Sequence, residues 1–389
     1  MKKDHNVADN VNPERLVESF LKLAQINGPS RDERLVADFV QTELTKMGFT
    51  VAFDEANKHT GGNCGNLFAW WEGLDSHIPP LLFSTHLDTV MPTEGLKPII
   101  REEIIYSDGT TILGADDRAA LAAYLEAIHV IQENHTHCGP IELILTVSEQ
   151  TSLYGSKNLD YTKVHSKTGY IFDSSGDVGQ IILSGPYGAY LHWVITGKPA
   201  HLGLDAAEGV SAIVIAAEAI SKMKLGQINE FTVANIGTIQ GGELGSIIPH
   251  KTKMTGEIRS YTLEGLQRQV QQMREAVETS AKKYGGTVEV DQEKKYIGYD
   301  IPIDDKNTQV AIRAVERVGL KPFFVKTLGG ADTNNFREHG VSVMTLGNGF
   351  CEIHSYNEHI SIKNLVNTAR LTVGLVEEFA NTHWERSGS

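Results

Sequence analysis

The sequence has few cysteines, no excess of basic residues and no long apolar run, and each absence excludes a class of protein. The three cysteines, Cys64, Cys138 and Cys351, are an odd number without the spacing of a zinc ribbon. They predict neither a disulfide framework nor a thiolate metal site. We therefore expect the protein to work in a reducing compartment, the cytoplasm.

Acidic residues outnumber basic ones, 49 to 35, which gives a formal net charge of −14. Nucleic acids and anionic lipids bind clustered Lys and Arg, and the sequence contains no such cluster. No apolar run approaches the length that spans a bilayer, and the first residues lack the apolar segment of a signal peptide. We expect neither a nucleic-acid partner nor a membrane partner.

With 389 residues, the chain suits two domains, or one large domain that carries an insertion. Short apolar strands alternate with helices, which predicts an α/β fold with a mostly parallel sheet. Ser30 and Glu33 form a capping-box pattern in front of a helix that ends near Gly48. The predicted strands are residues 80–84, 141–147, 169–172 and 341–346.

The rhythm changes between about residues 188 and 296, where the order becomes strand, helix, strand, strand, helix, strand. This is the order of a ferredoxin-like α+β unit. We therefore predict a discontinuous larger domain, residues 1–187 and 297–389, with a smaller domain, residues 188–296, inserted into it.

Acidic and histidine residues follow the predicted strands of the larger domain. Ligands gather at the carboxyl ends of strands in open α/β sheets, so these side chains should converge. Converging carboxylates repel one another unless a cation neutralises them, and imidazole with carboxylate suits zinc. A catalytic zinc site keeps one position open for water. The residues at these ends are His86, Asp88, Asp116, Asp117, Glu149, Asp173 and His354.

Each of these residues also has a structural interpretation, because a single polar residue after a strand commonly caps a loop or helix. Asp117 in particular fits the first turn of the next helix, where the helix dipole favours an acid. Asp88 lies two residues beyond His86, a spacing that lets its carboxylate accept the second ring N–H of that histidine.

Four motifs spread over nearly the whole chain resemble those of one superfamily. They are residues 84–90 (Ser-Thr-His-Leu-Asp-Thr-Val), 113–118 (Leu-Gly-Ala-Asp-Asp-Arg), 329–334 (Gly-Gly-Ala-Asp-Thr-Asn) and 353–355 (Ile-His-Ser). The sequence resembles the peptidase T, carboxypeptidase G and aminoacylase superfamily of dinuclear zinc hydrolases. The Gly-Ala-Asp-Asp element is most similar to the peptidase T branch, the tripeptide aminopeptidases.

The resemblance implies a role for each matching residue of the larger domain. His86 and Asp173 would hold one zinc ion, His354 would hold a second, and Asp116 would bridge the two. Cobalt or manganese could replace zinc. Glu149 takes the position of the general base, and Asp88 that of the acid that orients the histidine.

The resemblance also implies roles outside the metal cluster. The inserted domain corresponds to a lid and dimerisation domain, so a homodimer is expected. His201 matches a lid histidine that reaches a partner's active site and stabilises the oxyanion, and Arg259 matches an arginine that binds a substrate carboxylate. Asp332 and Asn334 fall in a motif expected to contact the substrate, a short peptide.

Two departures from the family pattern leave three functions open. Gln150 stands where relatives have a second Glu as a metal ligand, and residues 246–249 read Ser-Ile-Ile-Pro instead of Asn-Ile-Val-Pro. Gln150 remains a candidate ligand through its amide oxygen. The leading hypothesis is a tripeptide-type aminopeptidase. The alternatives are an N-acyl amino acid amidohydrolase and a catalytically silent binding protein that has lost its second metal.

Overall fold

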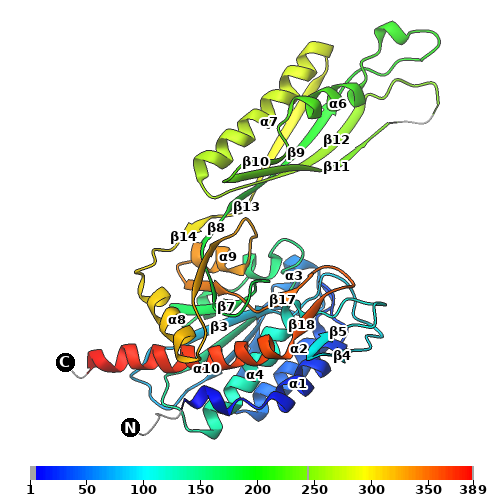
Figure 1. The fold of residues 1–389 in the computed structure, drawn as a ribbon. Coiled ribbons are helices and arrows are strands. Elements are labelled where there is room, and N and C mark those ends of the chain that lie inside the picture. The colour runs from blue at the N-terminus through cyan, green and yellow to red at the C-terminus, as the bar shows by residue number, and fades with distance from the viewer. Residues whose placement is uncertain (1–5, 243–244, 388–389) are drawn as a thin grey trace. The chain divides into compact units, whose positions relative to one another are not determined.

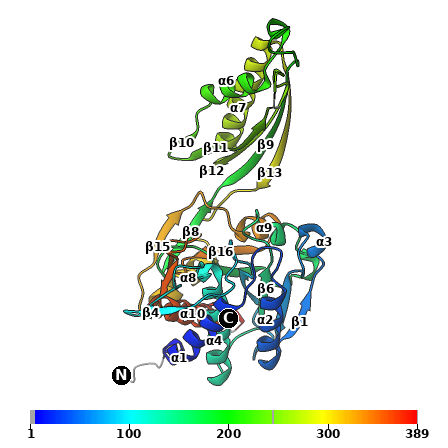
Figure 2. The ribbon, with the colours of Figure 1, turned by 90° about the vertical axis from the view of Figure 1, so that its right-hand side faces the viewer.

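The computed structural model describes residues 6–242 and 245–387, which divide into two compact units (Figures 1 and 2). Unit 1 takes the chain up to residue 183, residues 301–326 and the chain from residue 331 onwards. Unit 2 consists of residues 184–300 and 327–330. Among the described residues, no helix is long and apolar enough to cross a membrane.

The largest sheet has nine strands in the order β1-β2-β6-β3-β7-β16-β8-β14, with β15 beside β8, and all of them except β14 and the end of β8 belong to unit 1. The four central strands β6, β3, β7 and β16 are parallel, whereas the flanking strands pair antiparallel. Every residue of β3 and β6 is buried, as expected for parallel strands covered on both faces. The predicted α/β fold with a mostly parallel central sheet is thus confirmed. The strands are β1 (Thr50–Phe53), β2 (Leu67–Trp71), β3 (Leu81–His86), β6 (Ile141–Thr146), β7 (Thr168–Phe172), β8 (Gln180–Gly185), β14 (Tyr299–Asp300), β15 (Phe323–Lys326) and β16 (Ser342–Leu346).

The main helix of unit 1 is α4 (Ala115–Glu133), which is almost wholly buried. Its many alanines let α1 and α10 pack closely against it, and α10 also packs against α8. The other helices are η1 (Val7–Asn10), α1 (Pro13–Gln25), α2 (Arg34–Lys46), α3 (Asn57–Thr60), α5 (Tyr154–Lys157), η2 (Tyr161–Lys163), α8 (Lys306–Arg317), α9 (Asp332–Glu338) and α10 (Ile362–Ser387).

The predicted capping box before α2 is wrong. Glu33 occupies the N-cap position, but its side chain does not cap the helix, and Asn63 Oδ1 accepts the Arg34 backbone N–H at 3.0 Å. The Ser30 hydroxyl donates instead to Asp88, and the Glu33 carboxylate accepts hydrogen bonds from Ser148. Buried partners elsewhere in unit 1 therefore outcompete the local capping interaction.

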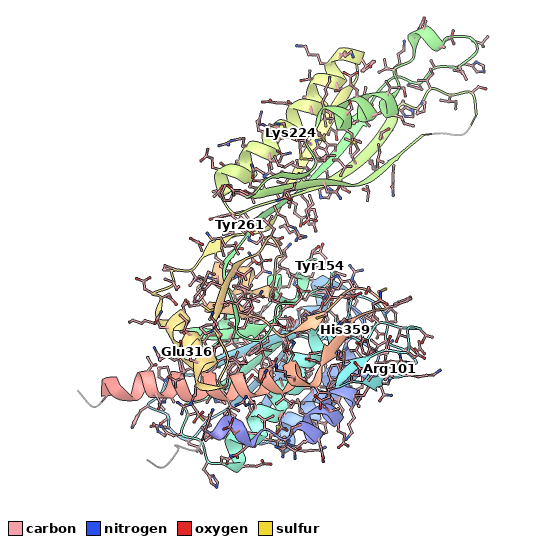
Figure 3. The ribbon with its side chains drawn as sticks, in the orientation of Figure 1. Arg101, Tyr154, Lys224, Tyr261, Glu316 and His359 are labelled. Carbon is pink, nitrogen blue, oxygen red and sulfur yellow. The ribbon has the colours of Figure 1, made fainter. Side chains whose placement is uncertain are left out.

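A small four-stranded sheet, β17-β18-β5-β4, completes unit 1. Arg101 and His359, labelled in Figure 3, belong to its strands β4 and β18, and the His359 ring stacks on Tyr106 with centroids 5.1 Å apart. The connection from β17 to β18 carries His354, so this sheet fixes both ends of that loop. The strands are β4 (Ile99–Arg101), β5 (Ile104–Tyr106), β17 (Phe350–Cys351) and β18 (His359–Ser361).

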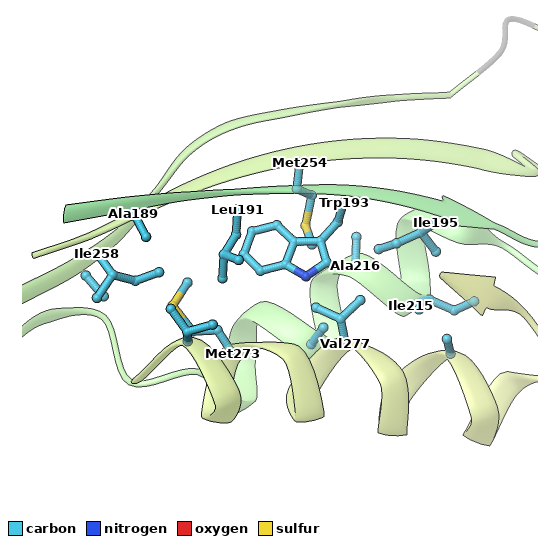
Figure 4. Close-up of a cluster of buried hydrophobic side chains, with 14 of the residues drawn as sticks. Ala189, Leu191, Trp193, Ile195, Ile215, Ala216, Met254, Ile258, Met273 and Val277 are labelled. Carbon is cyan, nitrogen blue, oxygen red and sulfur yellow. The ribbon is translucent and has the colours of Figure 1, made fainter. Parts of the chain in front are cut away.

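Unit 2 is an antiparallel sheet in the order β10-β11-β12-β9-β13, with α6 and α7 on one face. The six predicted elements are present in the predicted order, and β10 is an additional edge strand. Alternate residues of β9 point into a core around the fully buried Trp193, between the sheet and the helices (Figure 4). The elements are η3 (Ala206–Glu208), α6 (Ala212–Lys222), α7 (Leu263–Tyr284), β9 (Tyr187–Thr196), β10 (Gly226–Asn229), β11 (Thr232–Gly241), β12 (Lys251–Ser260) and β13 (Thr287–Tyr296).

Candidate metal centre

The candidate site lies at the carboxyl ends of the parallel strands of unit 1. His86 is the last residue of β3, and Asp173 directly follows β7. Asp116 lies at the start of α4, where its backbone angles are not yet helical. Strand and helix ends therefore deliver histidine and carboxylate side chains to the same edge of the sheet, as the sequence predicted.

Asp116 lies between the two histidines. Its Oδ1 atom is 3.1 Å from His86 Nε2, and its Oδ2 atom is 3.1 Å from His354 Nε2. Although burial opposes ionisation, the hydrogen bonds from these histidines hold the pKa of Asp116 far below its ordinary value. The carboxylate is thus ionised, and each of its oxygens faces a different imidazole.

This donor set fits divalent metal ions. Two ligand atoms about 2 Å from a tetrahedral zinc ion lie roughly 3.3 Å apart, which is close to both spacings around Asp116. Asp173 Oδ1 is 4.0 Å from His86 Nε2, near enough to complete the His86 side of the cluster after a small adjustment. One carboxylate faces two histidines, and the bridging role that the resemblance implies for Asp116 stays a prediction.

Asp117 is the residue that the sequence interpretation placed at a helix end. Ligand atoms of His86, Asp117 and Asp173 all lie within 4.8 Å of one another, so Asp117 belongs to the same cluster. Both of its oxygens already accept hydrogen bonds, from Thr85 Oγ1 at 2.5 Å and from Asn348 Nδ2 at 2.7 Å. These bonds favour Asp116 over Asp117 as the metal ligand, and make Asp117 a buried support behind it.

The second ring nitrogen of His86 has a closer partner than the predicted one. Nδ1 lies 2.9 Å from the backbone carbonyl oxygen of Asp88 and 3.5 Å from its carboxylate oxygen Oδ1. The carbonyl therefore accepts the Nδ1–H, so Nε2, which faces Asp116, is the ring nitrogen that could bind a cation. The Asp88 carboxylate instead accepts the backbone N–H groups of Glu149 at 3.0 Å and Gln150 at 3.1 Å.

Glu149 follows β6 and is 9% exposed. Burial, together with the charge of Asp173, raises the pKa of Glu149 well above its ordinary value. The same two causes, burial and a neighbouring carboxylate, raise the pKa of Asp173 to about 8. A carboxylate with a raised pKa is a stronger proton acceptor, which suits a general base near neutral pH.

Gln150 reaches the same cluster. Its amide nitrogen lies 3.0 Å from Asp116 Oδ2, the oxygen that also faces His354. The two ends of an amide are interchangeable by rotation, which would put the Gln150 oxygen at that point. Gln150 is therefore placed to contact a cation on the His354 side.

Buried Glu358 was not predicted. Its carboxylate accepts the backbone N–H groups of Gly114 at 2.7 Å and Asp116 at 2.9 Å, and so holds the turn that presents Asp116. Burial and the Asp116 charge raise the pKa of Glu358 to about 7. Its position four residues after His354 was the signal available in the sequence.

Asp332 and Asn334 lie at the start of α9, and both are buried in unit 1. The Asp332 carboxylate accepts hydrogen bonds from the hydroxyls of Thr146 and Ser156, while Asn334 Oδ1 accepts the backbone N–H of Ala331 at 3.1 Å. These are structural contacts, and the substrate-binding role of the two residues stays a prediction.

His201 and Arg259 belong to unit 2. His201 is exposed, and its Nδ1 accepts the Gly203 backbone N–H at 3.1 Å. Arg259 on β12 donates to Glu257 Oε1 at 2.6 Å and to the Leu328 carbonyl at 3.0 Å. All of these hydrogen bonds lie within unit 2, and the roles assigned to His201 and Arg259 stay predictions.

Residues 82–378 match the model of peptidase family M20/M25/M40. The chain belongs to this family. The predicted resemblance to dinuclear zinc peptidases is thereby confirmed at the family level, and the protein is a peptidase.

Among curated relatives, the uncharacterised protein YqjE of Bacillus subtilis is 39% identical over 95% of this chain and 100% of its own length. Peptidase T of Clostridium perfringens is 26% identical over 87% of this chain and 83% of its own length.

Solved structures agree with this membership. The aminopeptidase PepT from Bacillus cereus has a TM-score of 0.87 at 40% identity, covering 95% of this chain and 99% of its own. A tripeptidase from Staphylococcus aureus has a TM-score of 0.90 at 36% identity, with the same two coverages. A dinuclear metal-binding M20 peptidase from Bacillus subtilis, at 16% identity, supports the fold alone.

Proposed function

We propose that this M20 peptidase is a metal-dependent aminopeptidase that cleaves short peptides, with tripeptides as its main substrates. The observation that carries the proposal is Asp116, whose two carboxylate oxygens each lie 3.1 Å from a different histidine. His86, Asp116, Asp173 and His354 would hold up to two zinc ions, with cobalt or manganese as substitutes. The similarity to an aminopeptidase and a tripeptidase supports this substrate class.

A divalent cation in this site would supply a Lewis acid for the scissile carbonyl and lower the pKa of nearby water. Glu149 would accept the proton of the attacking water and deliver it to the leaving amine. The raised pKa of this buried carboxyl, caused by burial and by Asp173, suits both transfers. Asp88 would hold Glu149 in place through the backbone N–H bond at 3.0 Å.

We further propose that unit 2 serves as lid and dimerisation domain of a homodimer. In that assembly His201 would stabilise the oxyanion of a partner's site, and Arg259 would bind the substrate carboxylate. The three free cysteines support the reducing cytoplasm as the compartment.

A peptide panel with zinc, cobalt or manganese added to the metal-free protein tests the proposal. We expect release of the N-terminal residue from free tripeptides, much slower cleavage of di- and tetrapeptides, and no cleavage of N-acetylated peptides. Faster turnover of N-acyl amino acids would instead make the protein an amidohydrolase. The replacement of a ligand Glu by Gln150 leaves a third outcome, a catalytically silent binding protein that has lost its second metal. A protein that binds no second metal ion and turns over none of these substrates would establish it.

A further inference from the structure

The segment before α2 directs two side chains at the loop that carries Glu149. Both belong to the sequence pattern typical of a helix cap, yet neither caps the helix. Glu33 is fully buried, and its Oε1 accepts the Arg31 backbone N–H at 2.7 Å, the Ser148 backbone N–H at 2.9 Å and the Ser148 hydroxyl at 3.1 Å. Ser30 Oγ donates to Asp88 Oδ2 at 2.5 Å.

Two buried carboxylates thus hold three consecutive residues after β6. Glu33 holds Ser148, and Asp88 holds the N–H groups of Glu149 and Gln150. Ser148 has a φ of 52°, in the left-handed region that residues other than glycine adopt rarely and at an energetic cost. A grip on both its backbone and its side chain opposes relaxation of Ser148 to an extended conformation, which would turn Glu149 away.

We infer that Glu33 is a positioning residue for peptide hydrolysis, holding Ser148 left-handed and thereby fixing the direction of the Glu149 carboxylate. The inference rests on the proposed function, in which Glu149 is the general base. A general base must lie within hydrogen-bond reach of its proton, and a misplacement of about 1 Å can cost roughly 10²-fold in rate. Ser30 supports the same loop by fixing Asp88.

Glu142 offers a matched control in unit 1. It is 2% exposed and accepts the backbone N–H groups of His165 at 3.1 Å and Ser166 at 2.8 Å. It is therefore also a buried carboxylate that grips two groups of a loop, and it lies on β6 itself, far along the strand from Glu149. Loss of the Glu33 carboxylate removes three hydrogen bonds and loss of the Glu142 carboxylate removes two, so both variants free backbone N–H groups of a loop.

The test compares Glu33→Ala with Glu142→Ala in the full-length, metal-loaded protein, by kcat, KM, metal content and melting temperature. We expect Glu33→Ala to lower kcat by at least about tenfold, with KM and metal content unchanged. Glu33→Gln, which keeps an acceptor oxygen, should lose less. Glu142→Ala should lower the melting temperature and leave kcat close to that of the wild type.

Two backgrounds separate positioning from general damage. Glycine adopts a positive φ without strain, so in a Ser148→Gly background Glu33→Ala should cost clearly less in kcat. In a Glu149→Gln background Glu33→Ala should cost nothing further, because Glu33 acts through Glu149. If Glu33→Ala does not fold, Glu33→Gln is carried through the same comparisons.

A kcat like that of the wild type in both Glu33 variants would overturn the inference. An equal loss in all backgrounds, or a loss that follows metal content, would do the same. Inactive Glu149→Gln beside normal Glu33 variants would leave the proposed function intact. An active Glu149→Gln protein would refute the base role and the inference together.

Discussion

The two units differ in how many charged side chains they bury. Unit 1 buries carboxylates and histidine side by side, and Asp88, Asp117 and His86 are each no more than 1% exposed. The interior of unit 2 consists of apolar side chains around Trp193. Among its described residues, Lys295 is the one charged residue that is buried. Its nitrogen donates to Glu257 at 2.7 Å, so even this charge is paired within the unit.

This difference in the burial of charged side chains has a consequence for the stability of unit 1. Burial of several carboxylates beside one another is unfavourable unless a cation compensates, so the candidate metal site lowers the stability of unit 1 as long as no cation is bound. Unit 2 has an ordinary hydrophobic core, and the charged residues Lys251 and Lys253 of its strand β12 are exposed. Changes to the residues that would hold a metal ion in unit 1 (His86, Asp116, Asp173 and His354) should therefore alter metal binding, whereas changes in unit 2 should leave it untouched.

The largest expected effect is that of Asp116→Ala. This variant loses the carboxylate that both histidines face, so metal content and turnover should fall together, by more than about 10²-fold, since even partners of metal ligands commonly matter by 10–100-fold. Glu257→Ala in unit 2 is the control and should keep its full metal content. Elemental analysis and a tripeptide assay on both proteins check this prediction. A metal-loaded Asp116→Ala protein would show that metal binding does not depend on this carboxylate.

A mixing experiment tests whether His201 of unit 2 takes part in the reaction. If His201 acts across a dimer, His201→Ala and Glu149→Gln, each inactive alone, should form heterodimers with one complete site. A random mixture would then regain about a quarter of wild-type activity, because about half of the dimers are heterodimers and each has one of its two sites intact. Two distinguishable tags allow the heterodimer to be isolated. An inactive heterodimer would remove the trans-acting role.

The stability of the metal-free protein should depend on pH. Burial and neighbouring charges raise the pKa of Asp173 to about 8 and that of Glu358 to about 7, so the folded state binds more protons than the unfolded state above pH 4. Stability should therefore fall as pH rises from 5 to 8, lowering the melting temperature by at least about 3 °C. Added zinc should restore more stability at pH 8 than at pH 6. A flat pH profile would contradict the predicted repulsion.

The smallest expected effect is that of Gln150→Glu. A neutral amide attracts a dication less than a carboxylate does, so the metal on the His354 side should bind more weakly than the one held by His86, Asp116 and Asp173. Calorimetric titration of the metal-free protein should resolve one tight and one loose step. Gln150→Glu should tighten the loose step and raise activity at low metal several-fold. Two equally tight steps, unchanged in the variant, would show that Gln150 is no ligand.

Much of the fold could be predicted because its signals are local. Apolar runs defined the central strands, and residues at strand ends identified His86 and Asp173, since parallel strands place their carboxyl ends together. Glu33 and Ser30 could not be assigned correctly. Their pattern is also that of a helix cap, and only the packing of α2 against the sheet decides which partner each side chain takes. Asp117 was expected both among the converging side chains and in the first turn of a helix, and it lies in both places.

The most direct test of the central claim is a single comparison of Glu149→Gln with the wild type, measuring tripeptide turnover and bound metal on the same samples. Glutamine fills the same space but cannot accept a proton, so turnover should fall by about 10²–10⁴-fold while metal content stays the same. If the variant keeps more than about a tenth of wild-type turnover, Glu149 is not the general base. If it loses its metal as well, the residue holds the cluster together and some other group accepts the proton.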